Sequence, residues 1–326
     1  MVVRGERKLP LLVIAGPTGV GKSAAAVALA SRVPLEVVSA DSRQVYRFMD
    51  VATGKPTAAE RGAVAHHLIG VVDPDDRYQA ARFRRDAVDA IADIHRRGRL
   101  PVVVGGTGLY IRALLRGLDP APPADPEFRR ELAGVAAREG RAALHARLAA
   151  TAPEMAQRLH PNDQVRVMRA LEKVRAGTTN VPGSWASGNG AASAISVSAI
   201  SSYHLIYIGL TMERKALAER LCARAATMAK SGLAEEVEAL LARGYDPDLP
   251  ALQGIGYREF VRVVRGQLDA TTAVQLMQRD TVRYAKRQAT WFMREPDIEW
   301  QHVTPSTGAE SIAGIIEMRL REGGLH

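Results

Sequence analysis

Short apolar runs alternate with helix-like segments through the first third of the chain. Residues 9–15, 35–39 and 100–104 are apolar runs of the length expected for buried parallel strands. Residues 22–32 are rich in Ala, and residues 80–97 repeat their apolar positions at helical spacing. This alternation predicts an α/β fold: a P-loop-type parallel sheet core with helices on both faces.

The pattern changes near residue 120. Residues 126–176 show helical spacing with no strand pattern, and residues 177–202 are dominated by Gly, Ala, Ser, Thr and Asn, a composition that buries little apolar surface. The domains we expect are an α/β core with a helical C-terminal half over 1–120 and 204–326, a helical insertion over 121–177, and a flexible loop over 178–203.

The C-terminal half returns to the core through one more apolar run at residues 205–210. Thr211 is placed to cap a helix that continues to about residue 230. Helical patterns at 233–243, 255–265 and 270–294 complete this half.

A glycine-rich motif joins the first strand to the first helix. Its sequence GPTGVGKS fits the phosphate-binding pattern G-x-x-x-x-G-K-[ST] in the required strand–helix context. Backbone amides and the helix N-terminus favour an anion there, Lys22 adds a charge, and Ser23 is suited to hold Mg²⁺. The residues expected to bind a diphosphate are Gly16, Pro17, Thr18, Gly19, Val20, Gly21, Lys22 and Ser23.

The motif does not say which phosphate compound is bound. A GTPase would need an N-K-x-D motif, which is absent, and an ATPase usually has a later strand that ends in Asp, whereas the run at 100–104 ends in Gly-Gly-Thr. The carboxylate that does follow a strand is Asp41. A P-loop nucleotide kinase acting on another substrate remains open at this point.

Composition adds a preference for an anionic partner. Lys and Arg total 44 against 35 for Asp and Glu, a net charge of +9, but charge alone does not choose among nucleic acid, membrane and metabolite. The segment from Arg129 to Arg175 contains ten basic residues and five acidic ones. The single cysteine, Cys222, excludes a disulfide within the chain, and the first apolar run is too short to span a membrane, so we expect a cytoplasmic protein.

Seven motifs in order resemble those of the tRNA dimethylallyltransferase (tRNA isopentenyltransferase) family of bacterial type. They are GPTGVGKS, SADSRQVYRFMDVATGKP, HHLIGVVDP, GRLPVVVGGTGLYIRALLRG, HPND, GIGYRE and YAKRQATWF. The resemblance covers roughly residues 10–300. It implies transfer of a dimethylallyl group from dimethylallyl diphosphate to the exocyclic amine of the adenine 3′-adjacent to the anticodon in tRNA, with release of pyrophosphate and without ATP.

The resemblance also implies roles for individual residues. Asp41 would accept the proton of the amine, and Thr107 would donate to the bridging oxygen. Arg220 and Arg224, four residues apart and hence on one helical face, would reach the diphosphate. Arg214 is a weaker candidate for this role. Mg²⁺ at Ser23 would be the cofactor.

Several stretches correspond to family segments that contact tRNA through a flipped base and its neighbouring phosphates. For Trp291 or Phe292, the competing interpretation is a position in the hydrophobic core. A monomer is expected. The residues expected to contact tRNA are Asp41, Ser42, Arg43, Gln44, Thr107, Arg129, Val165, Arg166, Val167, Met168, Arg169, Gln253, Gly254, Ile255, Gly256, Tyr257, Arg258, Lys286, Arg287, Gln288, Ala289, Thr290, Trp291, Phe292 and Met293.

The chain departs from the family pattern at four positions. Gly70, Val165, Gln253 and Met293 replace residues that are more often polar or charged, and each replacement removes a possible polar or phosphate contact. Two further alternatives remain open. One is an isopentenyltransferase that acts on free adenine nucleotides, and the other is a tRNA-binding module without catalysis. The basic insertion argues against a free nucleotide, which needs no such surface.

Overall fold

The computed structural model describes residues 8–118, 122, 125–177, 200 and 202–323. The chain divides into two compact units, one formed by Met1–Gly117 with Ala194–His326 and the other by Leu118–Ser193. Each unit is described by itself. Most of the loop predicted over 178–203 lies outside the described residues.

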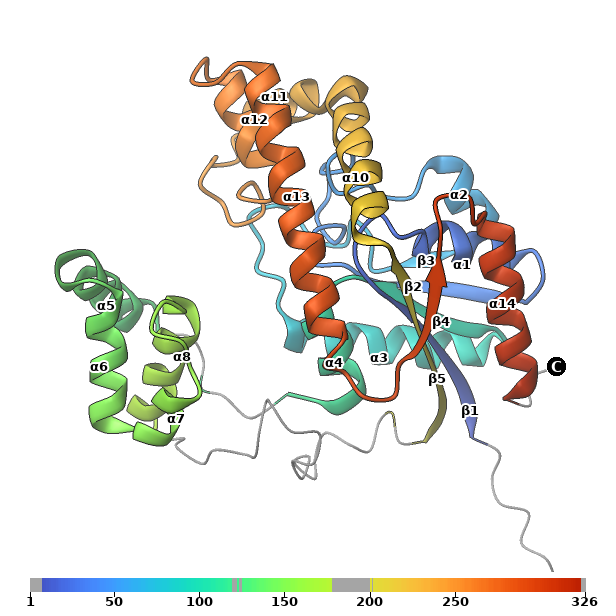
Figure 1. Ribbon diagram of the computed structural model, residues 1–326, viewed down its shortest axis with the longest axis horizontal. Coiled ribbons are helices and arrows are strands. Elements are labelled where there is room, and N and C mark those ends of the chain that lie inside the picture. Colours follow the sequence, from blue (N-terminus) through green and yellow to red (C-terminus); the bar gives the residue numbers. More distant parts are fainter. Residues whose placement is uncertain (1–7, 119–121, 123–124, 178–199, 201, 324–326) are drawn as a thin grey trace, which may run out of the picture. The chain divides into compact units, whose positions relative to one another are not determined.

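The larger unit is built on a parallel sheet, whose strands lie among the helices in Figure 1. The strand order is β3-β2-β4-β1-β5-β6, so β1 lies in the interior of the sheet between β4 and β5. The bounds are β1 Leu9–Ala15, β2 Leu35–Ala40, β3 His66–His67, β4 Leu100–Gly105, β5 Tyr203–Met212 and β6 Glu299–Val303.

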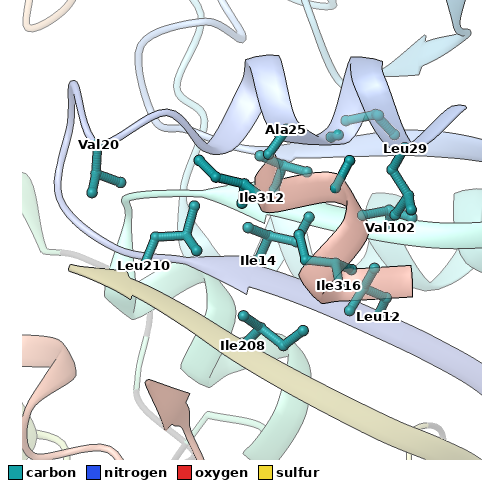
Figure 2. Packing of buried hydrophobic residues seen from close by; sticks show 14 of the residues in the cluster. Leu12, Ile14, Val20, Ala25, Leu29, Val102, Ile208, Leu210, Ile312 and Ile316 are labelled. Carbon is teal, nitrogen blue, oxygen red and sulfur yellow. The ribbon is translucent and has the colours of Figure 1, made fainter. Parts of the chain in front are cut away.

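Helices cover both faces of this sheet because side chains alternate between the faces of each strand. Leu12 and Ile14 of β1 join a buried cluster with Ile312 and Ile316 (Figure 2). Phe83, on a helix that contacts β2 and β4, is fully buried but lies outside that cluster. The predicted α/β fold with a P-loop-type parallel sheet is confirmed.

Ten helical segments of the larger unit lie within the described residues. Their bounds are α1 Lys22–Ala30, α2 Ala58–Ala63, α3 Ala80–Arg96, α4 Gly108–Arg116, α10 Arg214–Met228, the π-helix η1 Ala229–Leu233, α11 Ala234–Ala242, α12 Tyr257–Val264, α13 Ala270–Phe292 and α14 Ala309–Glu322.

Two details of the C-terminal half differ from the sequence-based expectation. Thr211 does not cap α10, because β5 continues through it to Met212. The cap is Glu213, whose carboxylate accepts hydrogen bonds from the amides of Lys215 (2.9 Å) and Ala216 (2.8 Å). The C-terminal half is also not purely helical, since β6 pairs in parallel with β5.

The smaller unit consists of helices within its described part. They are α5 Pro126–Glu139, α6 Arg141–Thr151, α7 Pro153–Gln157 and α8 Gln164–Arg175. Leu132, Leu144, Leu148 and Val167 are almost fully buried and form the centre of a separate apolar cluster. This unit therefore has a hydrophobic core of its own.

Across the described residues, none of the helices combines the length and the apolar character that crossing a bilayer requires.

Candidate active site

The phosphate loop lies between β1 and α1, at the carboxyl edge of the sheet where ligands of parallel α/β folds bind. Its backbone requires glycine at several positions. Gly16 has φ 141°, Gly19 79° and Gly21 109°, and a Cβ at Gly16 would stand 2.4 Å from the carbonyl oxygen of Leu210. The motif glycines thus allow the chain to wrap closely around an anion.

Lys22 is the buried cation of this loop. Its side chain is almost fully enclosed, and its Nζ donates to the carbonyl oxygens of Gly16 (2.9 Å) and Pro17 (2.8 Å). Burial lowers the pKa of Lys22 to about 8, with the negative charge of Asp41 opposing this shift and the positive charge of Arg224 adding to it. The ammonium is therefore poorly stabilised by its own chain, which favours binding of an anion.

Asp41 follows the last residue of β2 and caps a turn. Its Oδ1 accepts hydrogen bonds from the amides of Arg43 (2.8 Å) and Gln44 (3.3 Å). Within the described residues no hydrogen bond to Oδ2 is found. The turn thus fixes the carboxylate through one oxygen, while its charge acts on Lys22 and Arg224.

Thr107 stands at the start of α4, beside the turn of Asp41. Its Oγ1 accepts a hydrogen bond from the amide of Ser42 (3.0 Å), and its own amide donates to the carbonyl oxygen of Ala40 (3.2 Å). The hydroxyl of Tyr284 is also hydrogen-bonded to Thr107. Burial and the charge of Asp41 raise the pKa of Tyr284 to about 12, with Arg43 opposing them. Tyr284 is a site residue that the sequence analysis missed, although it opens the motif YAKRQATWF.

Gln288 of α13 connects the phosphate loop with the loop that follows β4. Its Oε1 accepts from the amide of Thr18 (2.9 Å), and its Nε2 donates to the carbonyl oxygen of Gly106 (2.8 Å). The residue is 6% exposed. Gln288 was expected to contact tRNA. In the structure its side chain is instead buried between these two loops.

Arg224 of α10 is half-buried, and Arg220, one turn earlier, is exposed. Burial lowers the pKa of Arg224, Asp41 raises it, and Arg220 lowers it further. The guanidinium of Arg224 requires a glycine at position 54, because a Cβ there would lie 1.9 Å from its Nη2. Arg214 is the first residue of α10 and is exposed.

Arg224 also borders a cavity of about 440 Å³ that combines cationic and apolar side chains. Gln44 supports its wall, since its Nε2 donates to the carbonyl oxygens of Thr53 (3.3 Å) and Gly54 (3.1 Å). The lining residues are Asp50, Val51, Gly54, Lys55, Pro56, Thr57, Arg61, Arg224, Thr227, Met228 and Ser231.

Several residues expected to contact tRNA have buried side chains in the larger unit. Phe292 is fully buried, so the core position holds for it. Tyr257 is 1% exposed, and its hydroxyl donates to Glu236 at 2.6 Å. Arg258 is half-buried and is paired with Glu259 and Asp280. The bonds of Tyr257 and Arg258 thus connect α12 with α11 and with α13.

Other residues expected to contact tRNA differ in how far they are exposed. Lys286, Arg287, Thr290 and Met293 are exposed along α13, with Met293 at 74%. Ile255 and Ala289 are half-buried, Gln253 is exposed, and Gly254 and Gly256 are buried. The guanidinium of Arg112 stacks on Trp291 at 4.4 Å from the ring centroid.

In the smaller unit, two arginines that were expected to contact tRNA are paired with a carboxylate. Arg129 donates to Glu172 through Nε (2.6 Å) and Nη2 (2.9 Å), and Arg169 donates to the same carboxylate at 2.8 Å. Val167 is fully buried, so its side chain belongs to the core of this unit. Val165 and Arg166 are exposed, and Met168 is half-buried.

Oxygen donors are the chemistry that Mg²⁺ requires. No group of three His, Cys, Asp or Glu side chains that could hold a metal ion occurs in the described part of the chain. Ser23 is exposed at the first turn of α1, beside the phosphate loop. A site completed by the phosphate oxygens of a ligand fits these residues, whereas an all-protein metal site does not.

Fold and site together define a P-loop-type α/β protein with a buried lysine and a strand-end carboxylate at one edge of its sheet. Models of two families match the chain: IPP transferase over residues 44–295 and isopentenyl transferase over residues 9–67. The chain belongs to the IPP transferase family.

Curated relatives agree over nearly their whole length. A tRNA dimethylallyltransferase 1 of Syntrophotalea carbinolica is 48% identical over 90% of this chain and 91% of the relative. A tRNA dimethylallyltransferase of Anaeromyxobacter dehalogenans is 46% identical over 95% of this chain and 99% of the relative.

Solved structures of similar architecture also exist. The full-length tRNA isopentenylpyrophosphate transferase of Bacillus halodurans has a TM-score of 0.68 and 38% identity, covering 97% of this chain and 98% of that chain. A eukaryotic dimethylallyltransferase acting on tRNA has a TM-score of 0.74 and 26% identity, covering 96% of this chain and 79% of that chain.

Proposed function

We propose that the chain transfers a dimethylallyl group from dimethylallyl diphosphate to the exocyclic amine of the adenine 3′-adjacent to the anticodon in tRNA and releases pyrophosphate. The observation that carries the proposal is that a buried lysine of the phosphate loop is influenced by the charge of Asp41, the carboxylate that follows β2. The first group suits a leaving diphosphate, and the second suits an amine that must lose a proton.

The reaction needs the leaving group to be neutralised as the allylic carbon–oxygen bond breaks. Lys22, the loop amides and Arg224 are the groups that would stabilise the charge that develops on the diphosphate. Mg²⁺, held through Ser23 and phosphate oxygens, would supply further positive charge when bound. Arg220 is exposed one turn away, so we expect a smaller contribution from it.

The reaction also needs a proton acceptor. The nitrogen lone pair of the adenine amine forms the new bond to the allylic carbon, the electrons of the carbon–oxygen bond leave with pyrophosphate, and the amine proton goes to Asp41. A positioned base of this kind contributes roughly 10²–10⁴-fold. Thr107, held by the amide of Ser42 and bonded to Tyr284, lies beside this carboxylate and would orient the reacting groups.

The cavity beside Arg224 supports binding of the prenyl donor. It offers cationic groups for phosphate together with the apolar side chains of Val51, Pro56 and Met228 for the prenyl group. Exposed basic residues of α13 and of the smaller unit, including Lys286, Arg287 and Arg166, would bind tRNA phosphates. We expect a monomer that acts in the cytoplasm, where tRNA is found.

A direct assay tests this proposal. The purified chain is incubated with dimethylallyl diphosphate, Mg²⁺ and unmodified tRNA, and the nucleosides are analysed by mass spectrometry. A dimethylallyl adduct on adenosine is the expected result. Prenylation of AMP but not of tRNA would instead support a free-nucleotide enzyme, and phosphate transfer from ATP to a nucleoside monophosphate would support a kinase.

A further inference from the structure

The helix α13 reaches the phosphate loop through one buried amide side chain. Gln288 lies 270 positions along the chain from Thr18, yet it accepts the hydrogen bond of the Thr18 amide at 2.9 Å. With its other end it donates to the carbonyl oxygen of Gly106 at 2.8 Å. One side chain thus spans the loop for the leaving group and the loop that carries Thr107.

The surrounding backbone is shaped to admit this side chain. A Cβ at Gly106 would lie 2.3 Å from Nε2 of Gln288 and 3.4 Å from the carbonyl oxygen of Gly16. A Cβ at Gly108 would lie 2.2 Å from the indole of Trp291, which is also on α13. Glycine at these two positions lets α13 pack directly against the start of α4.

We propose that Gln288 is a positioning residue that sets the spacing between the phosphate loop and the Gly106–Thr107 loop, and that it does not contact RNA. A primary amide is suited to this task because it carries an acceptor oxygen and a donor NH2 group side by side, and here the oxygen meets a backbone N–H and the NH2 group a backbone carbonyl. The proposal rests on the proposed function, because the spacing matters for transfer between two bound substrates.

The same bonds link the two substrates through α13. Lys286 and Arg287, next to Gln288 along the helix, are exposed and available to tRNA phosphates, while Gln288 is buried against the donor loop. A shift of α13 on RNA binding would therefore act on the Thr18 amide. Misplacement of reacting groups by about 1 Å can lower a rate on the order of 10²-fold.

The test compares Gln288→Met with a matched control on the same helix. Methionine keeps the length of glutamine and removes both hydrogen bonds. Gln278→Met is the control, because Gln278 of α13 is half-buried and donates to the carbonyl oxygen of Cys222 at 3.0 Å, on the α10 side of the helix. Steady-state prenylation, thermal melting and calorimetry with inorganic pyrophosphate are measured for both variants and the unaltered chain.

We expect Gln288→Met to lower kcat by about 10- to 100-fold, with KM for tRNA unchanged, and to weaken pyrophosphate binding. Gln278→Met should change none of these values beyond the effect of any loss in Tm. A higher KM for tRNA with an unchanged kcat would make Gln288 an RNA contact and overturn the proposal. Equal losses of kcat in both variants at equal Tm would overturn it as well.

Failure of the proposed function gives a different result. If the unaltered chain transfers no prenyl group, the assigned reaction is wrong, but the pyrophosphate titration still tests the spacing role. Weaker binding by Gln288→Met than by Gln278→Met would support that role, and equal binding would refute it.

Discussion

Strand β2 holds buried charge in a different way from the phosphate loop. Near the start of the strand, Glu36 is 5% exposed and receives His67 Nε2 at 2.6 Å and Arg97 Nη2 at 2.8 Å. The hydrogen bonds from Arg97 lower the pKa of Glu36 to about 2, burial opposes them, and His67 assists. In the phosphate loop, which follows β1 at the carboxyl edge of the sheet, the buried Lys22 donates to two neutral carbonyl oxygens, and burial lowers its pKa to about 8.

This difference distinguishes Glu36, a charge that stabilises the fold, from Lys22, a charge that is suited to bind a ligand. A buried ion with charged partners is stabilised by its own chain, and removing a partner is costly. A buried cation that donates hydrogen bonds only to neutral groups is stabilised further when an anion arrives. The amino edge of β2 therefore holds the sheet together, whereas the carboxyl edge, with Lys22 and Asp41, is prepared for a ligand.

The largest expected effect is at the carboxyl edge. Asp41→Asn keeps the size of the side chain and an oxygen for the amides of Arg43 and Gln44, but it removes the proton acceptor. We expect kcat to fall by roughly 10²–10⁴-fold, with Tm and tRNA affinity nearly unchanged. Single-turnover prenylation, melting and a tRNA binding assay measure the three quantities. An unchanged rate would remove Asp41 from the role of base.

The matching change at the amino edge should act on stability instead. Glu36→Gln removes the charge that Arg97 and His67 share, and we expect the free energy of unfolding to fall by about 2 kcal/mol, while kcat of the folded protein stays the same. Because the folded-state pKa of Glu36 is depressed, this advantage is complete above the ordinary pKa of 4.5 and disappears as pH falls toward 2. Urea unfolding of both proteins at pH 7 and pH 3 measures the difference. A loss of kcat without a loss of stability would contradict the structural role.

The sequence predicted most of the larger unit because its central strands are buried on both faces. Such strands read as continuous apolar runs, which is the pattern at β1, β2, β4 and β5. Strand β6 lies at the sheet edge with mostly exposed or half-buried residues, so its sequence EWQHV gives no such run. The edge strand was therefore missed.

The site was predictable where local sequence determines local structure. Glycines and Lys22 of the phosphate loop form a contiguous motif, and Asp41 follows a strand directly. The bond from Thr18 to Gln288 joins residues that are 270 positions apart, so no local pattern could reveal it. Charge counting likewise found the basic residues of the smaller unit but did not show that Glu172 pairs with Arg129 and Arg169.

The smallest expected effect is a pH dependence of anion binding that comes from Lys22. Its folded-state pKa of about 8 lies below the ordinary 10.5, so the free protein loses this charge above pH 8, and an anion then binds with uptake of a proton. We expect the Kd for pyrophosphate to be flat with respect to this group below pH 8 and to rise by about tenfold per pH unit above it.

Lys22→Arg provides the control, because arginine keeps its charge throughout this range and pyrophosphate itself titrates equally in both experiments. Calorimetry at several pH values, in buffers of different ionisation enthalpy, measures both Kd and proton uptake. Stability should change in the opposite direction: between pH 8 and 10.5 the unfolded chain binds more protons at this residue than the folded one, so the contribution of Lys22 to stability rises with pH. Equal pH profiles for the two proteins would mean that the buried lysine is already charged without its anion, and the contrast between Glu36 and Lys22 would then be wrong.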